Sequence, residues 1–333
     1  MEKKLKIKPK YNPCWISFLG AVSGVLQALD KQEYDLVNTG GYTGYAFALP
    51  NVMNNCTCPS GPTSLGEMWN EILTGTNSLG YETTLYNDPI CFPEKEGELT
   101  EKDRQRALRI FKTVKASIDA DYPVVLWGLP IPEYGIVAGY QGNFYLASTY
   151  RSLMKIPEEP VHYESLQAPG GLHAITFKNL IGDTDPDSDR ISLQRAVTLA
   201  KGDVTEKNYS AGIQAYIEWT NVLENAPEKD VIYHGNAYVN ECTLEAKEIA
   251  FAFLQRLAEK YLEEPFSLKL QAAGMKYQKV VEQLKEFQKL FPFAMEGEIT
   301  KEKRLEGAKV LRNAIPFEEE ALKLMKEALS LWK

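Results

Sequence analysis

The sequence predicts an α+β protein, in which an N-terminal helix packs on an antiparallel sheet and an all-helical region follows. Three observations predict this fold class. Apolar residues recur at three- and four-residue steps over residues 15–29, four strand-like segments lie between residues 123 and 180, and helical periods fill the chain from residue 192 onward. We expect a first domain at residues 1–181 and a helical domain at residues 190–333, on either side of the acidic loop GDTDPDSDR.

The first helix has recognisable start signals. Asn12 suits the N-cap and Pro13 the first helical position, so we expect Cys14 in the opening turn, where backbone N–H groups lack partners. Gly20 and Gly24 are expected to let another backbone approach this helix closely.

Residues 34–98 are rich in turn residues, and we expect loops over a core there, interrupted by a short helix at 65–73 and a strand at 81–86. A helix over residues 100–120 opens with Thr100 and Asp103 in a capping-box-like arrangement. The strands that follow are expected at 123–128, 134–140, 143–149 and 172–180, the second and third joined by a Gln141-Gly142 turn.

The last part of the chain has helical periodicity throughout. Helices are expected at 192–201, 209–223, 244–261, 268–290, 301–312 and 318–332. Before them, Asp183, Asp185, Asp187 and Asp189 resemble the front of a calcium loop, but the required Gly is absent and Pro186 intervenes. A solvated loop and helix cap is the preferred interpretation of these four residues.

Composition limits the kinds of partner. The 333 residues carry a net charge of −8, which leaves no basic surplus for phosphates, so no nucleic-acid partner is expected. Five scattered cysteines do not form a disulfide framework, and Cys56 with Cys58 supplies only half of a structural zinc site. We expect a cytoplasmic protein with no metal or cofactor, a small-molecule or protein partner, and self-association through the helical region as an open alternative.

The N-terminus has the order of a signal peptide, with a lysine-rich segment before an apolar run. The run contains Ser17, Ser23 and Gln27, and Asp30-Lys31-Gln32 follows it in place of a small-residue cleavage site. The secretory interpretation is therefore not favoured. No other segment is long and apolar enough to suggest a membrane span.

A cysteine that opens a buried helix, followed by helix-rich sequence and then by a strand ending in Gly-Tyr, is the order of parts in papain-like cysteine enzymes. The chain resembles that superfamily, and more narrowly the group around butirosin biosynthesis protein H and the C39-like peptidases. The matching segments are Cys14-Trp15, PVVLWG at 123–128, GIVAGY at 135–140, and the helical stretches 208–223 and 235–258.

The resemblance implies a catalytic histidine six positions before the Gly of the Gly-Tyr pair, and Glu133 stands there. It implies a third polar residue on the next strand, near Ser148 or Thr149, and an oxyanion-hole glutamine before the cysteine, where Lys8 and Lys10 lie instead. The site is therefore atypical for the family.

A glutamate at position 133, where the family has a histidine, changes the chemistry expected of Cys14. A cysteine attacks as the thiolate, which an imidazolium favours and a nearby carboxylate disfavours. Two alternatives remain open: Glu133 is protonated in an apolar site and donates a hydrogen bond, or one of the three histidines, His162, His173 and His234, approaches from elsewhere. For His173, a strand position with satisfied hydrogen bonds is the simpler interpretation, and for Cys14 it is packing as a small apolar residue.

Two functions follow. The first is a cysteine acyltransferase or amidohydrolase, with Cys14 as nucleophile, its own N–H in the oxyanion hole and Glu133 as a proton donor or orienting group. The resemblance implies an amine-bearing small molecule as acceptor. The second is a catalytically inactive module that binds a small ligand or protein partner, with Glu133 and Tyr134 holding a cationic group. Candidate substrate-binding residues are Tyr42, Tyr45, Phe47, Trp127, Tyr134, Ser148 and Thr149. Gly40, Gly41 and Gly44 either line the same pocket or shape a hairpin.

Overall fold

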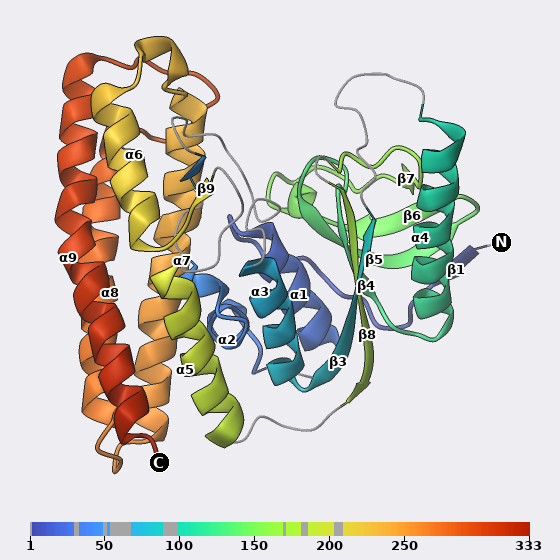
Figure 1. Ribbon diagram of the computed structural model, residues 1–333. Coiled ribbons are helices and arrows are strands. Elements are labelled where there is room, and N and C mark those ends of the chain that lie inside the picture. The colour runs from blue at the N-terminus through green and yellow to red at the C-terminus, as the bar shows by residue number, and fades with distance from the viewer. Residues whose placement is uncertain are drawn as a thin grey trace. The chain divides into compact units, whose positions relative to one another are not determined.

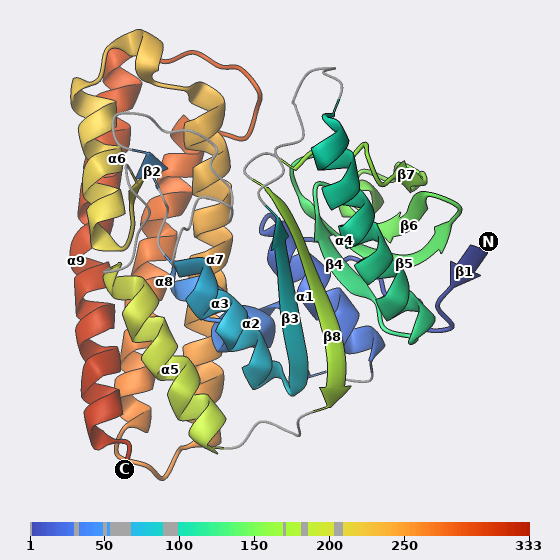
Figure 2. The same ribbon diagram turned by 45° about the vertical axis from the view of Figure 1, so that its right-hand side comes forward.

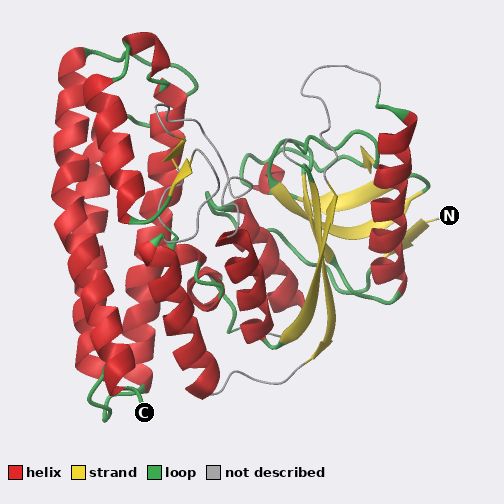
Figure 3. Cartoon of the chain, viewed as in Figure 1, coloured by secondary structure: helices red, strands yellow, loops and turns green. Residues whose placement is uncertain are grey.

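The computed structural model describes residues 2–29, 33–48, 52–53, 68–88, 99–168, 171–180, 186–202 and 209–333. The chain forms two compact units (Figure 1). The first contains residues 1–39 and 79–183, and the second contains residues 40–78 and 184–333. Strands gather in the first unit, whereas the described part of the second is almost wholly helical (Figure 3).

The first unit is built on an antiparallel sheet, and in the described residues this sheet has seven strands. Its order is β3-β8-β4-β5-β6-β7, and β1 pairs with the end of β5 at Gly139–Gln141, beyond the reach of β4. The strands are β1 (Glu2–Lys4), β3 (Tyr81–Asp88), β4 (Val124–Trp127), β5 (Tyr134–Gln141), β6 (Phe144–Ser148), β7 (Val161–His162) and β8 (Leu172–Leu180). The expected strands are confirmed, although the β5–β6 turn consists of Gly142 and Asn143 because Gln141 still pairs with Phe144.

Two helices cover opposite faces of this sheet, as Figure 1 shows. Helix α1 (Ser17–Ala28) lies on the face that carries Tyr134, whose ring is 5.7 Å from that of Phe18. Helix α4 (Glu101–Asp119) lies on the other face, where Phe111 packs against Tyr145. The expected N-terminal helix on an antiparallel sheet is therefore confirmed, and so is the start of α4, because the Thr100 side chain accepts a hydrogen bond from Asp103 N.

The second unit contains most of the helices. They are α3 (Met68–Thr76), α5 (Pro186–Lys201), α6 (Ile213–Asn225), α7 (Tyr233–Lys260), α8 (Ser267–Leu290) and α9 (Lys301–Leu331). Two short elements contain a boundary between the units: α2 (Leu36–Tyr42) and η3 (Asn77–Leu79). Of the other short 3-10 helices, η1 (Tyr45–Phe47) and η5 (Glu228–Asp230) belong to the second unit, and η4 (Tyr150–Ser152) belongs to the first. The short strands β2 (Val52–Met53) and β9 (Tyr209–Ser210) pair with each other.

Two expectations about this unit need correction. Residues 40–78 belong with the helices rather than with the first domain, because α3 packs on α5, and η1 packs on α5 and α7. The helices expected at 301–312 and 318–332 form the single helix α9, which contains Pro316. Ala314 and Glu318 are buried on either side of this proline, so packing against the rest of the unit holds the helix together despite the lost hydrogen bond.

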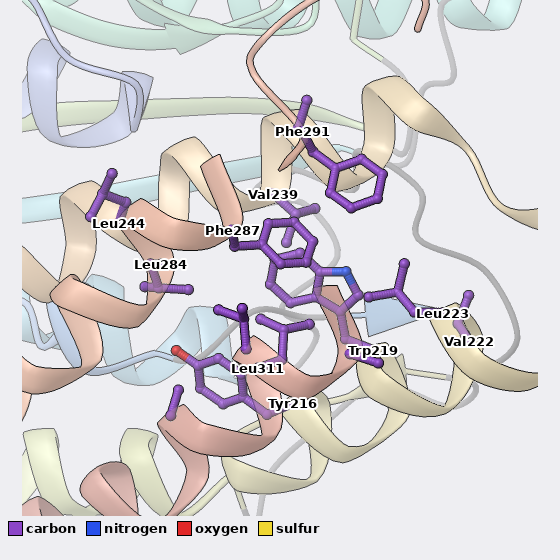
Figure 4. Packing of buried hydrophobic residues seen from close by; sticks show 14 of the residues in the cluster. Tyr216, Trp219, Val222, Leu223, Val239, Leu244, Leu284, Phe287, Phe291 and Leu311 are labelled. Atoms are coloured by element: carbon purple, nitrogen blue, oxygen red, sulfur yellow. The ribbon is translucent and has the colours of Figure 1, made fainter. Parts of the chain in front are cut away.

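The long helices enclose an apolar core that is rich in aromatic side chains (Figure 4). Trp219 of α6 lies 5.0 Å from the ring of Phe287 of α8, and its indole N–H donates to Asn236 Oδ1 at 2.7 Å. The larger members of the core are Tyr216, Trp219, Leu223, Tyr233, Leu244, Leu284, Phe287, Phe291 and Leu311. Of the helices in the described residues, none has both the length and the apolar character needed to cross a bilayer.

Candidate functional site

Cys14 lies outside the first helix rather than in its opening turn. Helix α1 begins at Ser17, and its N-cap is Ile16, which makes no side-chain capping hydrogen bond. The expectation that Asn12 caps the helix and Pro13 opens it is therefore wrong. Asn12 is engaged elsewhere: its side-chain amide donates to Ser23 Oγ at 2.8 Å and to Gln27 Oε1 at 3.0 Å.

The segment before Cys14 runs back along α1, and the two glycines make this possible. Asn12 N donates to Gly20 O at 3.0 Å. A Cβ atom at Gly20 would lie 2.5 Å from Asn12 O, and one at Gly24 would lie 2.1 Å from Lys10 O. The expected close approach to Gly20 and Gly24 is confirmed, and the approaching backbone is the chain's own.

The thiol of Cys14 is half-buried and donates a hydrogen bond to Ile16 O, with Sγ 3.1 Å from the oxygen. The Tyr11 hydroxyl donates to Cys14 O at 3.2 Å and lies 3.9 Å from Sγ. Tyr11 N in turn donates to Ser148 Oγ at 3.1 Å. Ser148, a candidate for the third polar residue of the site, thus anchors the segment that carries Cys14 to strand β6.

The start of α1 and the start of β5 meet directly. Tyr134 N donates to Ser17 Oγ at 3.0 Å, and both residues are buried. Glu133 precedes Tyr134 and is half-buried, and its carbonyl oxygen accepts hydrogen bonds from Gly128 N at 2.9 Å and Leu129 N at 3.2 Å. The backbone that carries the Glu133 carboxylate is therefore fixed at the end of the sheet where α1 begins.

The side chain of Tyr134 forms a buried pair with His173. The Tyr134 hydroxyl and His173 Nδ1 share a hydrogen bond of 3.1 Å, and the ring of Trp127 packs 4.9 Å from that of Tyr134. Burial lowers the pKa of His173 to about 4. Burial also raises the pKa of Tyr134 well above its ordinary value, and the Glu133 charge adds to this rise. Both members are therefore neutral at pH 7. Tyr134 and Trp127 are both buried.

The other two histidines have partners in their own surroundings. His162 Nδ1 accepts from Glu164 N at 3.3 Å, and the ring lies between Phe144 and Tyr163. His234 belongs to the second unit, where its Nδ1 donates to Ala294 O at 3.1 Å. Each histidine in the structure therefore has a local structural role.

Thr149, the other candidate for the third polar residue, is buried and serves a loop. Its hydroxyl lies 3.0 and 3.1 Å from the two carboxylate oxygens of Glu158 and accepts a hydrogen bond from Arg151 N at 3.2 Å. These hydrogen bonds hold together the loop that connects β6 and β7. They account for Thr149 as an anchor of that loop.

The three remaining candidates, Tyr42, Tyr45 and Phe47, belong to the second unit. Tyr42 and Phe47 are buried in its core, where both rings pack against Phe253. Gly41 is needed for this packing, since a Cβ there would lie 2.1 Å from the Phe253 ring. Packing therefore accounts for Tyr42 and Phe47 without a ligand, while Tyr45 is half-buried in η1.

The expectation that Asp189 belongs to a solvated loop and helix cap is wrong, and the hydrogen bond of the Tyr42 hydroxyl is part of the evidence. This hydroxyl donates to Asp189 at 2.6 Å, and the same carboxylate accepts from Lys260 Nζ and Tyr261 OH, each at 2.6 Å. Asp189 is fully buried rather than solvated. Lys260 balances its charge and the two phenols donate hydrogen bonds to it, so this residue connects α2 and α5 to the end of α7.

Several predicted residues lie outside the described ranges. These are Cys56, Cys58, Cys91, Asp183 and Asp185. Within the described ranges, no group of three or more His, Cys, Asp or Glu side chains is arranged to hold a metal ion.

Sequence reasoning missed the residues that join the elements of the site. Ser17 accepts the hydrogen bond from Tyr134 N, and Tyr11 N donates to Ser148 Oγ. The sequence signal that could have pointed to these contacts was strand alternation, which places the side chains of Tyr134 and Ile136 on one face of β5, the face that α1 covers.

Comparison of the chain with models of known protein families gives no match, and comparison with curated proteins gives none either.

Proposed function

We propose that the first unit is a papain-like module that binds a small ligand and in which Cys14 is not a nucleophile. The observation that carries this proposal is the hydrogen bond from the Cys14 thiol to Ile16 O at 3.1 Å. A thiol that donates to a carbonyl oxygen loses this bond on ionisation, and the thiolate then faces the negative end of the carbonyl dipole. Hydrogen bonding of this kind stabilises the neutral form and disfavours the thiolate.

The papain-like part of the proposal is supported by the join between α1 and β5. Ser17 Oγ accepts a hydrogen bond from Tyr134 N, and these two residues lie three positions after Cys14 and one position after Glu133, which stand at the cysteine and histidine positions of the family pattern. Glu133 occupies the histidine position in the sequence. A carboxylate there does not supply the positive charge that assists ionisation of the thiol.

Glu133 also suggests the class of ligand. Its side chain is half-buried, and its backbone is fixed by two hydrogen bonds to its carbonyl oxygen. A carboxylate held in this way suits a cationic group, such as an ammonium, which gains both a charge partner and a hydrogen-bond acceptor. Tyr134 supports Glu133 from within the sheet and does not contact the ligand, because the ring is fully buried.

The preference of the Glu133 site for a cationic group is tested with two probes of similar size and opposite charge, butylamine and butyrate. Their binding is followed by protein-observed NMR on the full chain. We expect saturable shifts at residues 128–134 with butylamine, and their loss in Glu133→Gln. Glu159→Gln is a matched control, because Glu159 is an exposed carboxylate in the same unit. Shifts that Glu133→Gln does not change, or equal shifts with butyrate, contradict this assignment.

The second candidate is a cysteine acyltransferase or amidohydrolase, as the family resemblance implies. It is favoured by the position of Cys14, which is half-buried and two residues before the N-cap of α1, close to a helix N-terminus. This function predicts a covalent acyl-enzyme. Incubation with an N-acetylcysteamine thioester followed by mass spectrometry separates the two. A Cys14-acyl adduct that is absent in Cys14→Ser supports the acyltransferase, and the unmodified protein supports the binding module.

A further inference from the structure

A groove lies between α4 and the β3–β8 strand pair, on the face of the sheet opposite α1. It has a volume of about 400 Å³, within the usual range for small-molecule sites. Figure 2 shows β3 and β8 running side by side, with α4 next to β8. The groove belongs entirely to the first unit and shares no lining residue with the Cys14 site.

The helix side of the groove consists of small residues. Thr113, Ala116, Ser117 and Ala120 line it and recur at three- and four-residue steps, so they form one stripe along α4. The apolar residues that pack α4 on the sheet, such as Phe111 and Val114, lie beside this stripe. Larger side chains in the stripe would fill the space between the helix and the strands.

The sheet side of the groove contains a buried hydroxyl group with no partner. Thr176 of β8 lines the groove and is only 3% exposed. Its Oγ1 has no hydrogen-bond partner in the part of the chain that the structure describes. Strand alternation places this side chain on the α4 face, because Thr176 pairs with Val124 while its neighbour Ile175 pairs with Val125. A buried hydroxyl without a partner is costly, so a bound group that accepts its hydrogen bond is favoured.

The remaining polar groups identify the kind of ligand that fits. Tyr86 and Tyr122 contribute phenol rings, and Lys178 contributes an exposed ammonium group. Among the described residues that line the groove there is no carboxylate. Two acidic residues on the adjoining elements form ion pairs: Asp88 with Arg106 at 3.5 Å, and Asp119 with Lys115 at 2.7 Å.

We propose that this groove binds a small aromatic carboxylate. The ring packs against the phenol rings and the small residues of α4, and the carboxylate accepts hydrogen bonds from Thr176 and Lys178. An anion suits a site whose polar groups are hydroxyls and an ammonium, and charge-assisted hydrogen bonds are the stronger kind. The proposal is independent of the proposed function at Cys14.

The test uses three probes with the same ring and different charge: benzoate, benzyl alcohol and benzylamine. Each is titrated into the full chain and followed by amide shifts. We expect saturable shifts in β3, β8 and α4 with benzoate, weaker binding of benzyl alcohol, and none of benzylamine. The same affinity for all three probes, or benzoate shifts elsewhere on the chain only, would overturn the proposal.

Two variants locate the site. Thr176→Val keeps the shape of the side chain, and we expect it to weaken benzoate binding about two- to tenfold, the effect of losing one hydrogen bond. Ala116→Phe fills the groove and should abolish binding. Lys102→Phe, at an exposed position on the first turn of the same helix, is the matched control and should leave the affinity unchanged. Unchanged binding in both Thr176→Val and Ala116→Phe would overturn the proposal, and an unchanged melting temperature excludes misfolding as the cause of a loss.

Discussion

Tyr134 N donates a hydrogen bond to Ser17 Oγ at 3.0 Å, and this contact joins the first residue of α1 to the first residue of β5. Both residues are buried. The bond satisfies a strand N–H at the position where β5 begins, and it fixes the helix start against the sheet. The relative positions of Cys14 and Glu133 depend on this join.

Removal of the Ser17 hydroxyl tests the contribution of this bond. We expect Ser17→Ala to lower the free energy of unfolding by about 1–3 kcal/mol, because the buried Tyr134 N–H is left without its acceptor. Ser330→Ala is the control, since its hydroxyl is exposed at the end of α9, and we expect a change of less than about 0.5 kcal/mol. Urea unfolding of both variants measures the difference. Equal effects would show that the Ser17 bond does not hold the join.

The packing of the chain along α1 gives a second prediction. Gly24→Ala places a Cβ atom 2.1 Å from Lys10 O, so the segment that leads to Cys14 must move away from the helix. We expect a loss of about 1–3 kcal/mol in unfolding free energy, the usual cost of overpacking. Gly142→Asn is a suitable control, because nothing lies within 4 Å of its Cβ position and Asn tolerates its positive φ. A Gly24→Ala protein as stable as the parent would contradict the close approach.

The protonation of His173 predicts a pH dependence of stability. Its pKa is 6.5 in an exposed setting and about 4 in the folded protein, because burial disfavours the charged form. Between these two values the unfolded chain binds the proton and the folded protein does not. Stability from this residue is therefore full above about pH 6.5 and is lost as the pH falls toward 4, by up to about 3 kcal/mol.

This dependence is measured by urea unfolding at pH 7 and pH 4.5. His173→Gln cannot take up a proton, so we expect its stability to change less over this interval than that of the parent. His162→Gln, whose ring is only half-buried at β7, is the control and should keep the slope of the parent. The same slope in the parent and in His173→Gln would show that His173 is not a buried neutral group.

A buried ion pair in the second unit gives a fourth prediction. Lys247 Nζ lies 3.5 Å from Glu318 Oε1, and Tyr216 OH donates to the same oxygen at 3.1 Å. Burial lowers the pKa of Lys247 and raises that of Glu318, while each partner opposes the shift of the other. We expect Lys247→Met to cost about 3–5 kcal/mol, because it leaves the Glu318 carboxyl buried without its charge partner.

The double variant Lys247→Met, Glu318→Leu provides the matched comparison. It removes both buried charges, and replacement of a whole buried pair by apolar residues is often neutral. We expect it to recover most of the stability lost in Lys247→Met, as measured by thermal and urea unfolding. A double variant less stable than the single one would mean that the two charges do not act as a pair.

Much of the fold was predictable from local patterns. Strands 134–140 and 172–180 and the helix beginning at Thr100 were found because alternation and capping act over neighbouring residues. The start of α1 was predicted incorrectly for a tertiary reason. Asn12 has the residue type of an N-cap, but its amide bonds Ser23 and Gln27 once the chain folds back along the helix.

The site was less predictable because its contacts join distant parts of the chain. The Tyr134–His173 bond spans 39 residues and the Ser17–Tyr134 bond spans 117, and no local pattern encodes either. Tyr42 and Phe47 have the glycine-rich surroundings of a pocket, yet both rings pack on Phe253 about 200 residues later. Sequence reasoning named Cys14, Glu133 and Ser148 as candidates, but it did not predict the hydrogen bonds of Tyr11 and Ser17.

The ionisation of Cys14 tests the central claim most directly, and the rate of alkylation by iodoacetamide measures it. The rate at Cys14 is followed by peptide mass spectrometry between pH 5 and pH 10, with Cys14→Ser to confirm the peptide. Donation of the thiol proton to Ile16 O predicts a rate that reaches half of its plateau only at about pH 8.5 or above, as for a free thiol or a more weakly acidic one. A rate that is already at its plateau at pH 6–7 would show a stabilised thiolate and contradict the account.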